Sequence, residues 1–289
     1  MRSIKAFIRA LLYSNIFISI CAVAFVLQGY FLLHIEHRFN LVALLGGLAT
    51  LFTYMLIRIV AVSRIRGYEP DGRWKFFLKN IFLMRMITVI SFLGCMMIYF
   101  LLQRSVQIAL LIPGFISVAY GIPLTIKSKA FRLRDVGIAK IFMISFVWAY
   151  VGAILPWVDT GGKIFAIIPA VLFLANFLFI FGITLPFDIK DQKIDAMNDV
   201  KTIPLLIGSE NTYSLSFLCL FASGATHLYL QRYIFIENPD YSIPISISIL
   251  IAGLTVYLTS KKNEKFVYFG LLDGMIILQF LLIYFYSER

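Results

Sequence analysis

Residues 186–195 read Pro-Phe-Asp-Ile-Lys-Asp-Gln-Lys-Ile-Asp, and residues 201–208 read Lys-Thr-Ile-Pro-Leu-Leu-Ile-Gly. Within this stretch, four of the fifteen carboxylates fall in twelve positions, at Asp188, Asp191, Asp195 and Asp199. At about 100° per residue the four share one face of a helix, with Lys190 and Lys193 on the far side. Like charges at this spacing destabilise a helix. The stripe therefore predicts a bound cation, a cationic ligand or a shifted protonation equilibrium; the alternative is an acidic, hydrated loop between helices.

The composition around this stretch is that of an integral membrane protein. The chain has 289 residues, 61% hydrophobic and 14% charged, with a mean hydropathy of +0.89. Soluble domains are about half apolar and about a quarter charged. The net charge of +11 is explained by Lys and Arg gathering in cytoplasmic loops, and it is not read as a sign of nucleic acid binding. The three cysteines lie inside apolar runs and are read as packing residues.

Apolar runs of about 20 residues recur along the whole chain and predict an all-α, polytopic bundle of nine transmembrane helices. The first run follows basic residues, as in a signal peptide, but it continues to Leu33 and is too long for a signal-peptide core. No soluble domain fits between the runs, so residues 1–289 are expected to form a single transmembrane domain. The predicted spans are 11–33, 41–62, 81–102, 106–126, 137–157, 163–186, 212–231, 242–260 and 266–286.

The distribution of basic residues predicts the topology. Nineteen of the 26 Lys and Arg residues fall at the N-terminus and in every second connection, five fall in the remaining connections and at the C-terminus, and two lie within spans. Cytoplasmic segments carry such an excess of positive charge. We therefore expect a cytoplasmic N-terminus, a C-terminus on the outer side, and the acidic stripe on the cytoplasmic side of the membrane.

Two basic segments share that side with the stripe. Tyr120 lies near the end of the fourth span, Lys127 follows it directly, and Arg132 comes a few residues later; these three residues are candidates for holding a phosphate. Arg58, near the end of the second span, either extends to the lipid headgroups or faces the bundle and contacts an anion. For Lys127 and Arg132 the alternative is the general positive bias of cytoplasmic loops, and for Tyr120 it is an ordinary anchor at the membrane interface.

Carboxylates and basic side chains at the end of an apolar bundle are suited to binding a phosphorylated lipid. Mg2+ takes one or two carboxylates and commonly shares a substrate phosphate, and Asp188, Asp191 and Asp195 suit that role. Asp199 fits less well, because Thr202-Ile-Pro204 should end the helix near it. Pro186 is expected to break the sixth helix just before the stripe. No residue stands out as a general base.

The sequence resembles the UbiA family of intramembrane prenyltransferases. The second Asp-rich motif of that family is an Asp-x-x-Asp-x-x-x-Asp run leading into Lys-Thr-Leu-Pro and a Gly, and it resembles residues 188–208. Tyr120 and Lys127 are similar to a Tyr and a Lys that contribute to diphosphate binding. The resemblance implies a nine-helix bundle, Mg2+ at Asp188, Asp191 and Asp195, and a polyprenyl diphosphate as donor.

The chain also departs from that family. The first Asp-rich motif, Asn-x-x-x-Asp-x-x-x-Asp, should end the second span, but Met55, Ile59 and Ser63 occupy its three positions in our alignment. Asp199 also stands where a Gly is expected. Half of the metal site is therefore missing, and a single Mg2+ is more plausible than two. Arg58 or a nearby arginine can replace the lost positive charge.

Three functions remain open from the sequence. The first is prenyl transfer from a polyprenyl diphosphate to an aromatic or lipid acceptor within the bilayer, with Asp188, Asp191 and Asp195 on metal and Lys127, Arg132, Tyr120 and Arg58 on diphosphate. The second is a non-catalytic protein of the same fold that binds an isoprenoid lipid. The third is an ion transporter, which would carry ionisable residues at mid-membrane depth.

Overall fold

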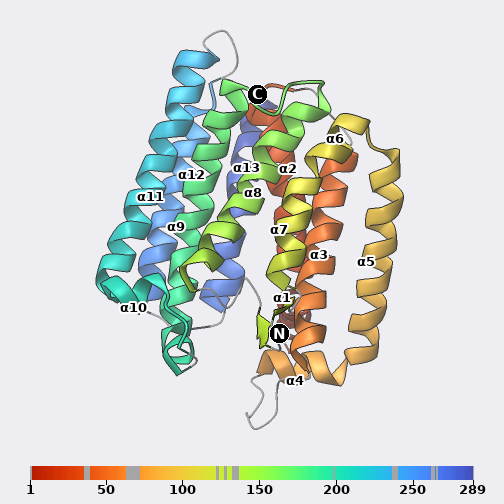
Figure 1. Cartoon of the computed structure of the whole chain (residues 1–289). Coiled ribbons are helices and arrows are strands. Elements are labelled where there is room, and N and C mark those ends of the chain that lie inside the picture. The colour runs from red at the N-terminus through yellow and green to blue at the C-terminus, as the bar shows by residue number, and fades with distance from the viewer. Residues whose placement is uncertain are drawn as a thin grey trace.

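The computed structural model describes residues 2–35, 40–62, 72–121, 124–126, 129–131, 137–197, 199–235, 240–261, 264 and 266–288. These residues form a bundle of long helices with the two ends of the chain at opposite ends of the bundle (Figure 1). The elements of the first half are α1 (Arg2–Tyr13), α2 (Ile16–Leu32), α3 (Leu41–Val62), α4 (Gly72–Lys79), α5 (Ile81–Leu101), α6 (Arg104–Ala109), α7 (Leu111–Gly121), β1 (Leu124–Ile126) and β2 (Lys129–Phe131). Those of the second half are α8 (Gly137–Asp159), α9 (Ile167–Met197), α10 (Ile203–Ile207), α11 (Ser209–Tyr229), the π-helical turn η2 (Leu230–Ile234), α12 (Ser242–Lys261), the π-helical turn η3 (Val267–Leu272) and α13 (Asp273–Ser287).

The membrane-spanning character of the bundle is clear, but the predicted count of nine spans is not confirmed. Within the described ranges, seven helices are long and apolar enough to cross a membrane, and a bent pair raises the number to eight. The predicted span 212–231 is the helix α11, which is long enough but more polar than the others. Its serines are used in packing: Ser223 donates a hydrogen bond to the carbonyl of Ala175 on α9 at 2.8 Å. Hydrogen bonds of this kind join helices inside a bilayer.

The first predicted span is interrupted. Residues 11–33 were expected to form one helix, but α1 ends at Tyr13 and α2 begins at Ile16 with a bend of 66° between them. Asn15 at the bend has a φ of 59°, in the left-handed region that Asn enters more readily than most residues. The fourth span is also shorter than predicted, because its helix ends at Gly121 and Leu124–Ile126 pairs with Lys129–Phe131 in an antiparallel hairpin.

Pro186 does not break the sixth predicted span, and α9 runs without interruption to Met197. Proline has no N–H to donate to the carbonyl four residues earlier, which is that of Gly182. Ser216 on α11 donates its hydroxyl to this carbonyl at 2.5 Å. A neighbouring helix thus replaces the missing hydrogen bond, as membrane helices allow. The acidic stripe therefore lies on a continuation of the spanning helix.

The interior of the bundle is built around α2, which packs against α3, α8 and α13. α11 packs along α9 on one side of the bundle, and α5 packs against α3 at the other edge (Figure 1). A short polar chain crosses the centre: the side-chain amide of Gln28 donates to Gln279 at 2.8 Å, and Gln279 donates to Ser248 at 3.0 Å. This chain ties α2, α13 and α12 together within the apolar core.

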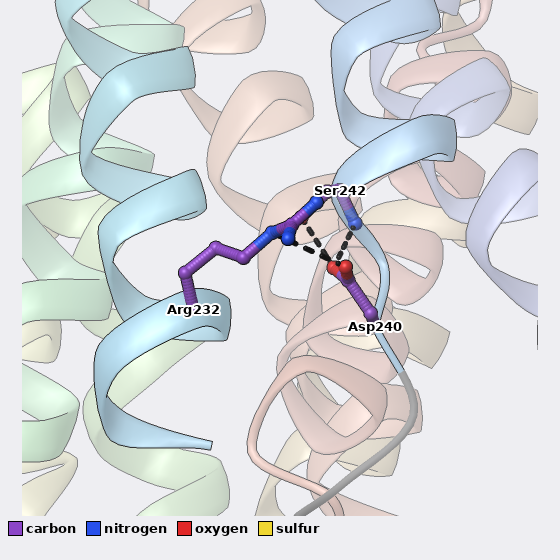
Figure 2. Close-up of polar contacts among 3 residues, drawn as sticks. All are labelled: Arg232, Asp240 and Ser242. Carbon is purple, nitrogen blue, oxygen red and sulfur yellow. Dashed lines mark hydrogen bonds and ion pairs between the residues drawn. The ribbon is translucent and has the colours of Figure 1, made fainter. Parts of the chain in front are cut away.

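At the upper end of the bundle, a small ionic cap links η2 to the start of α12 (Figure 2). The guanidinium of Arg232 lies 3.3 Å from a carboxylate oxygen of Asp240, and the other oxygen accepts hydrogen bonds from the backbone N–H and the hydroxyl of Ser242. Partial burial acts to raise the pKa of Asp240. The bonds from Ser242 and the charge of Arg232 outweigh burial and hold the pKa of this carboxyl below its usual value.

This cap gives a prediction on pH dependence. A carboxyl whose pKa is lowered by folding adds stability above its unfolded pKa of about 3.9, and this stability is lost as pH falls through the folded pKa. We expect Asp240→Asn to lower the melting temperature slightly at pH 7, with the difference from wild type disappearing near pH 3. Thermal unfolding in detergent at both pH values measures this. An equal difference at both would show that the charge of Asp240 has no part in the effect.

Candidate functional site

A cavity of about 690 Å³ opens between α3, α7, α8, α9 and the turn from η3 into α13. Four basic side chains and three acidic ones line it: Arg58, Arg73, Lys140, Lys190, Asp188, Asp191 and Asp273. Most of its remaining wall is apolar or aromatic, with Trp148, Ile180 and Ile276 among the contributors. A charged group at one end of a ligand and an apolar body at the other would therefore both find partners in it.

Asp188 is the most deeply buried acid of the cavity. Its side chain has no exposure, and its Oδ1 lies 2.6 Å from the Nζ of Lys140 on α8, which is 16% exposed. Its second oxygen, Oδ2, is buried and accepts no hydrogen bond within the described part of the chain. Burying an ion pair is tolerated only when the geometry is good, and removal of one partner leaves a costly isolated charge. Asp188 is therefore compensated by a lysine and still offers one oxygen to a ligand.

Lys140 is a functional candidate that sequence reasoning missed. It was counted only as one of the basic residues that set the topology. In the structure it stands in the first turns of α8, on the face that continues through Met143, Ile144, Val147 and Trp148 along the cavity wall. The available signal was a lysine at the start of an apolar helical face, since an ionisable residue inside a span normally has a partner.

Two arginines at the cavity donate hydrogen bonds to residues at the break between α1 and α2. Arg58 of α3 donates to the carbonyl of Tyr13 at 2.9 Å, one of the carbonyls left without a helical donor where α1 ends. Arg73 of α4 donates to the side-chain oxygen of Asn15, also at 2.9 Å. Arg58 therefore faces the cavity instead of extending to lipid headgroups. Both guanidiniums have fixed positions before any ligand binds.

Lys190 was expected to lie on the far side of α9 from the acidic stripe, but it lines the same cavity. Its Nζ lies 4.2 Å from the centroid of the Phe269 ring, and the guanidinium carbon of Arg73 lies at the same distance from that ring. Such cation–π contacts contribute about 0.5–2 kcal/mol each. The helical wheel was misleading because the cavity extends around α9 toward η3, which carries Phe269 to that side of the helix.

The face that α3 turns to the cavity differs from the one our alignment used. Thr53, Tyr54, Ile57, Arg58 and Ala61 line the cavity. Met55 is fully buried in a separate cluster with Phe77 and Met84, and Ile59 packs against that cluster. Ser63 lies outside the described residues. The α3 side chains that line the cavity therefore include one aromatic residue and one cation, and none of them is a carboxylate.

The other predicted residues are placed as follows. Asp191 and Tyr120 line the cavity with Asp188. Asp195 is half-buried one turn further along α9 and does not form part of the lining. Asp199 lies beyond the end of α9 with a φ of 54°, a left-handed conformation that explains why a glycine suits this position. Lys127 and Arg132 lie outside the described residues.

Among the described residues, two carboxylates lie close enough together in the cavity to share a metal ion. No cluster of three or more His, Cys, Asp or Glu residues suited to a metal occurs in the part of the chain that the structure describes. Asp188 and Asp191 are three residues apart on α9, and both face the cavity. One Mg2+ needs only one or two carboxylates when a substrate phosphate supplies further oxygens. The unpartnered Oδ2 of Asp188 fits such a single ion, and the residues that the structure describes offer no second set of carboxylates.

Fold and cavity together define an integral, multi-pass membrane protein with a polar site at one end of an apolar bundle. No family model and no curated protein matches the sequence. Solved structures do match. A UbiA homolog from Archaeoglobus fulgidus bound to GPP and Mg2+ has a TM-score of 0.62 at 11% identity, covering 97% of this chain and 100% of the other.

Two further structures give the same result. A structure of digeranylgeranylglyceryl phosphate synthase has a TM-score of 0.59 at 15% identity and covers 100% of both chains. The Archaeoglobus fulgidus homolog bound to DMAPP and Mg2+ has a TM-score of 0.57 at 13% identity, covering 96% of this chain and 99% of the other. The chain therefore has the fold of the UbiA-type intramembrane prenyltransferases, as its second Asp-rich motif predicts.

Proposed function

We propose that this protein binds a prenyl diphosphate in the cavity and transfers its prenyl group to a hydrophobic aromatic or lipid acceptor within the membrane. The observation that carries the proposal is the arrangement of one cavity: Asp188 and Asp191 beside four basic side chains, above an apolar and aromatic wall. Solved structures of the same fold hold GPP or DMAPP with Mg2+. We also propose that residues 1–289 act as one domain and that this end of the bundle faces the cytoplasm.

The diphosphate would lie among Arg58, Arg73, Lys140 and Lys190. Arginine binds phosphate oxygens through a planar fork, and lysine acts as a compact point charge. Tyr120 adds a hydroxyl at the same wall. Lys127 and Arg132 remain proposed further contacts from the segment after α7. Because the two arginines are held in place by Tyr13 and Asn15, little conformational entropy is lost when they bind an anion.

The prenyl chain would extend along the apolar wall. The cavity-lining face of α8 runs from Lys140 to Trp148, a rise of about 12 Å at about 1.5 Å per residue. Trp148 packs edge-on against Phe25, with their ring centroids 5.8 Å apart. Trp148 would therefore contact the far part of the prenyl chain. Phe187 and Phe269, which line the cavity at the level of the basic side chains, would stabilise the positive charge that develops on the allylic carbon when the diphosphate leaves.

A single Mg2+ at Asp188 and Asp191, with Asp195 as a further candidate ligand, completes the proposed site. When bound, the ion would neutralise part of the diphosphate charge and help it to leave. The chain's own residues do the rest: Lys140 neutralises Asp188, the arginines orient the diphosphate, and the apolar wall excludes water from the allylic carbon.

A non-catalytic isoprenoid-binding protein of the same fold is the second candidate. The ion pair between Lys140 and Asp188 favours it, because this lysine already neutralises the charge of a carboxylate that would attract a metal ion. Release of diphosphate separates the two functions. Purified protein in lipid nanodiscs should bind geranyl diphosphate and, with Mg2+ present, release inorganic diphosphate slowly even to water. Binding with no release, whether or not Mg2+ is added, would favour the second candidate.

Arg58→Gln tests whether the basic side chains of the cavity bind the diphosphate. We expect it to weaken the binding of geranyl diphosphate about tenfold or more, because a hydrogen bond to a charged group contributes about 1.5–3 kcal/mol. Isothermal titration calorimetry in nanodiscs measures the dissociation constant. Arg85→Gln is the matched control, since Arg85 is exposed on α5 and does not line the cavity. Equal affinities of the two variants for geranyl diphosphate would show that Arg58 does not bind it.

A further inference from the structure

The cavity holds an acid that no motif accounts for. Asp273 is the first residue of α13 and lies within a membrane-spanning segment, Val267–Ser287. Its side chain lines the cavity, and no ion pair or hydrogen bond of its carboxylate is found within the described ranges. The charges of Arg73 and Lys190 act on it through space. An ionisable residue inside a span, facing a cavity, indicates a functional role.

The depth of Asp273 places it below the basic residues. Phe269 contacts Arg73, Lys190 and Phe187. Phe187 is next to Asp188 in the chain, so Phe269 lies at the same depth as the charged side chains of the cavity. Asp273 follows Phe269 by four residues on the same cavity wall and therefore lies further toward the opposite end of the bundle, by about one helical turn. Ile276 continues the wall toward the apolar end. The carboxylate thus lies between the proposed diphosphate and its prenyl chain.

That position is next to the carbon where transfer takes place. The first carbon of a prenyl diphosphate is bonded to the phosphate oxygen, so it must lie immediately below the basic layer. Of the three acids that the described residues place on the cavity wall, Asp188 is held by Lys140 and Asp191 is nearer the end of α9. Asp273 is therefore the acid best placed to reach an acceptor that approaches this carbon.

We propose that Asp273 is a catalytic residue that binds the hydroxyl group of an alcohol or phenol acceptor and takes its proton; this rests on the proposed function. In the step, the bond between the first prenyl carbon and the diphosphate oxygen breaks, and diphosphate leaves with the electron pair. The acceptor oxygen forms the new bond to that carbon. The proton of the acceptor hydroxyl passes to the carboxylate of Asp273, so charge and atoms balance. A positioned base of this kind accelerates proton transfer by about 10²–10⁴-fold.

Water is the simplest hydroxyl acceptor, and it provides a test without knowledge of the natural one. Protein in nanodiscs is incubated with geranyl diphosphate and Mg2+, and geraniol and diphosphate are measured. Asp273→Asn should bind geranyl diphosphate within about twofold of wild type but hydrolyse it about 100-fold more slowly. Asp273→Glu should restore part of the rate. Glu210→Gln, at an exposed carboxylate on α11, should hydrolyse at the wild-type rate.

A second readout needs no variant. Dicyclohexylcarbodiimide reacts with carboxyl groups in apolar surroundings, and mass spectrometry should find Asp273 labelled in the wild type and protected by geranyl diphosphate. The inference is overturned if Asp273→Asn hydrolyses at the wild-type rate, or if labelling of Asp273 is unaffected by bound donor. A wild type that does not bind geranyl diphosphate, or that binds it and releases no diphosphate, would instead contradict the proposed prenyl transfer.

Discussion

Replacing Lys140 by Met should destabilise the protein by about 3–5 kcal/mol, more than the loss of any other basic residue at the cavity. Asp188 has no exposure, and Lys140 at 2.6 Å is its ion-pair partner. Without the lysine, a carboxylate would remain in an apolar wall between α8 and α9 with no opposite charge beside it. The melting temperature of the purified protein in detergent, without added Mg2+, is the measurement.

A double variant tests whether the lost stability comes from the unpaired carboxylate and not from the loss of the lysine itself. Lys140→Met with Asp188→Asn should recover most of the lost stability, because a neutral amide costs much less to bury than an isolated carboxylate. The same double variant should still fail to bind geranyl diphosphate tightly, since both the cation and the candidate metal ligand are gone. Lys79→Met, at an exposed lysine of α4, should change stability by less than about 1 kcal/mol. A Lys140→Met protein as stable as this control would refute the buried ion pair.

Much of the fold follows from the sequence because lipid imposes simple rules on it. Apolar runs must form helices in a bilayer, and the helices α3, α5, α8 and α12 begin and end close to the predicted limits, whereas α9 continues past the predicted end at residue 186 to Met197. The interruption at Asn15 was not predicted, because apolar residues continue on both sides of Ser14 and Asn15 and the run as a whole is long enough for one span. Nor could the unbroken α9, because the hydroxyl that replaces the missing donor of Pro186 comes from Ser216, thirty residues away in the chain.

The candidate site is predicted less completely, for a related reason. The acidic stripe is local and carries its own periodicity, so Asp188 and Asp191 stand out in the sequence. Lys140 and Asp273 are single charged residues whose meaning depends on which helix they face. Asp273 did leave a signal, as a lone carboxylate inside the apolar run 266–286. Its depth relative to Phe269 and the basic layer required the folded chain.

A second large effect is expected where α2 crosses α8. A Cβ atom at Gly29 would lie 2.1 Å from the carbonyl oxygen of Gly152 and 3.0 Å from Pro156, so the two helices are in backbone contact. Pro156 has no N–H to donate to the carbonyl of Gly152, four residues earlier, and the bare α-carbon of Gly29 packs against that carbonyl. Small residues allow this close approach of membrane helices.

Gly29→Ala should therefore destabilise the protein by about 1–3 kcal/mol or more, because neither backbone can move aside without shifting a whole helix. Gly114→Ala is the matched control: no atom lies within 4 Å of its added Cβ, and alanine in a helix should be neutral or slightly stabilising. Thermal unfolding of both variants in detergent tests this, and similar melting temperatures would contradict the close crossing.

The effect should reach the cavity, because Gly152 contacts Phe25, which packs on Trp148 at the apolar end of the site. Gly29→Ala protein that remains folded at low temperature should then bind geranyl diphosphate more weakly than Gly114→Ala, although residue 29 does not line the cavity.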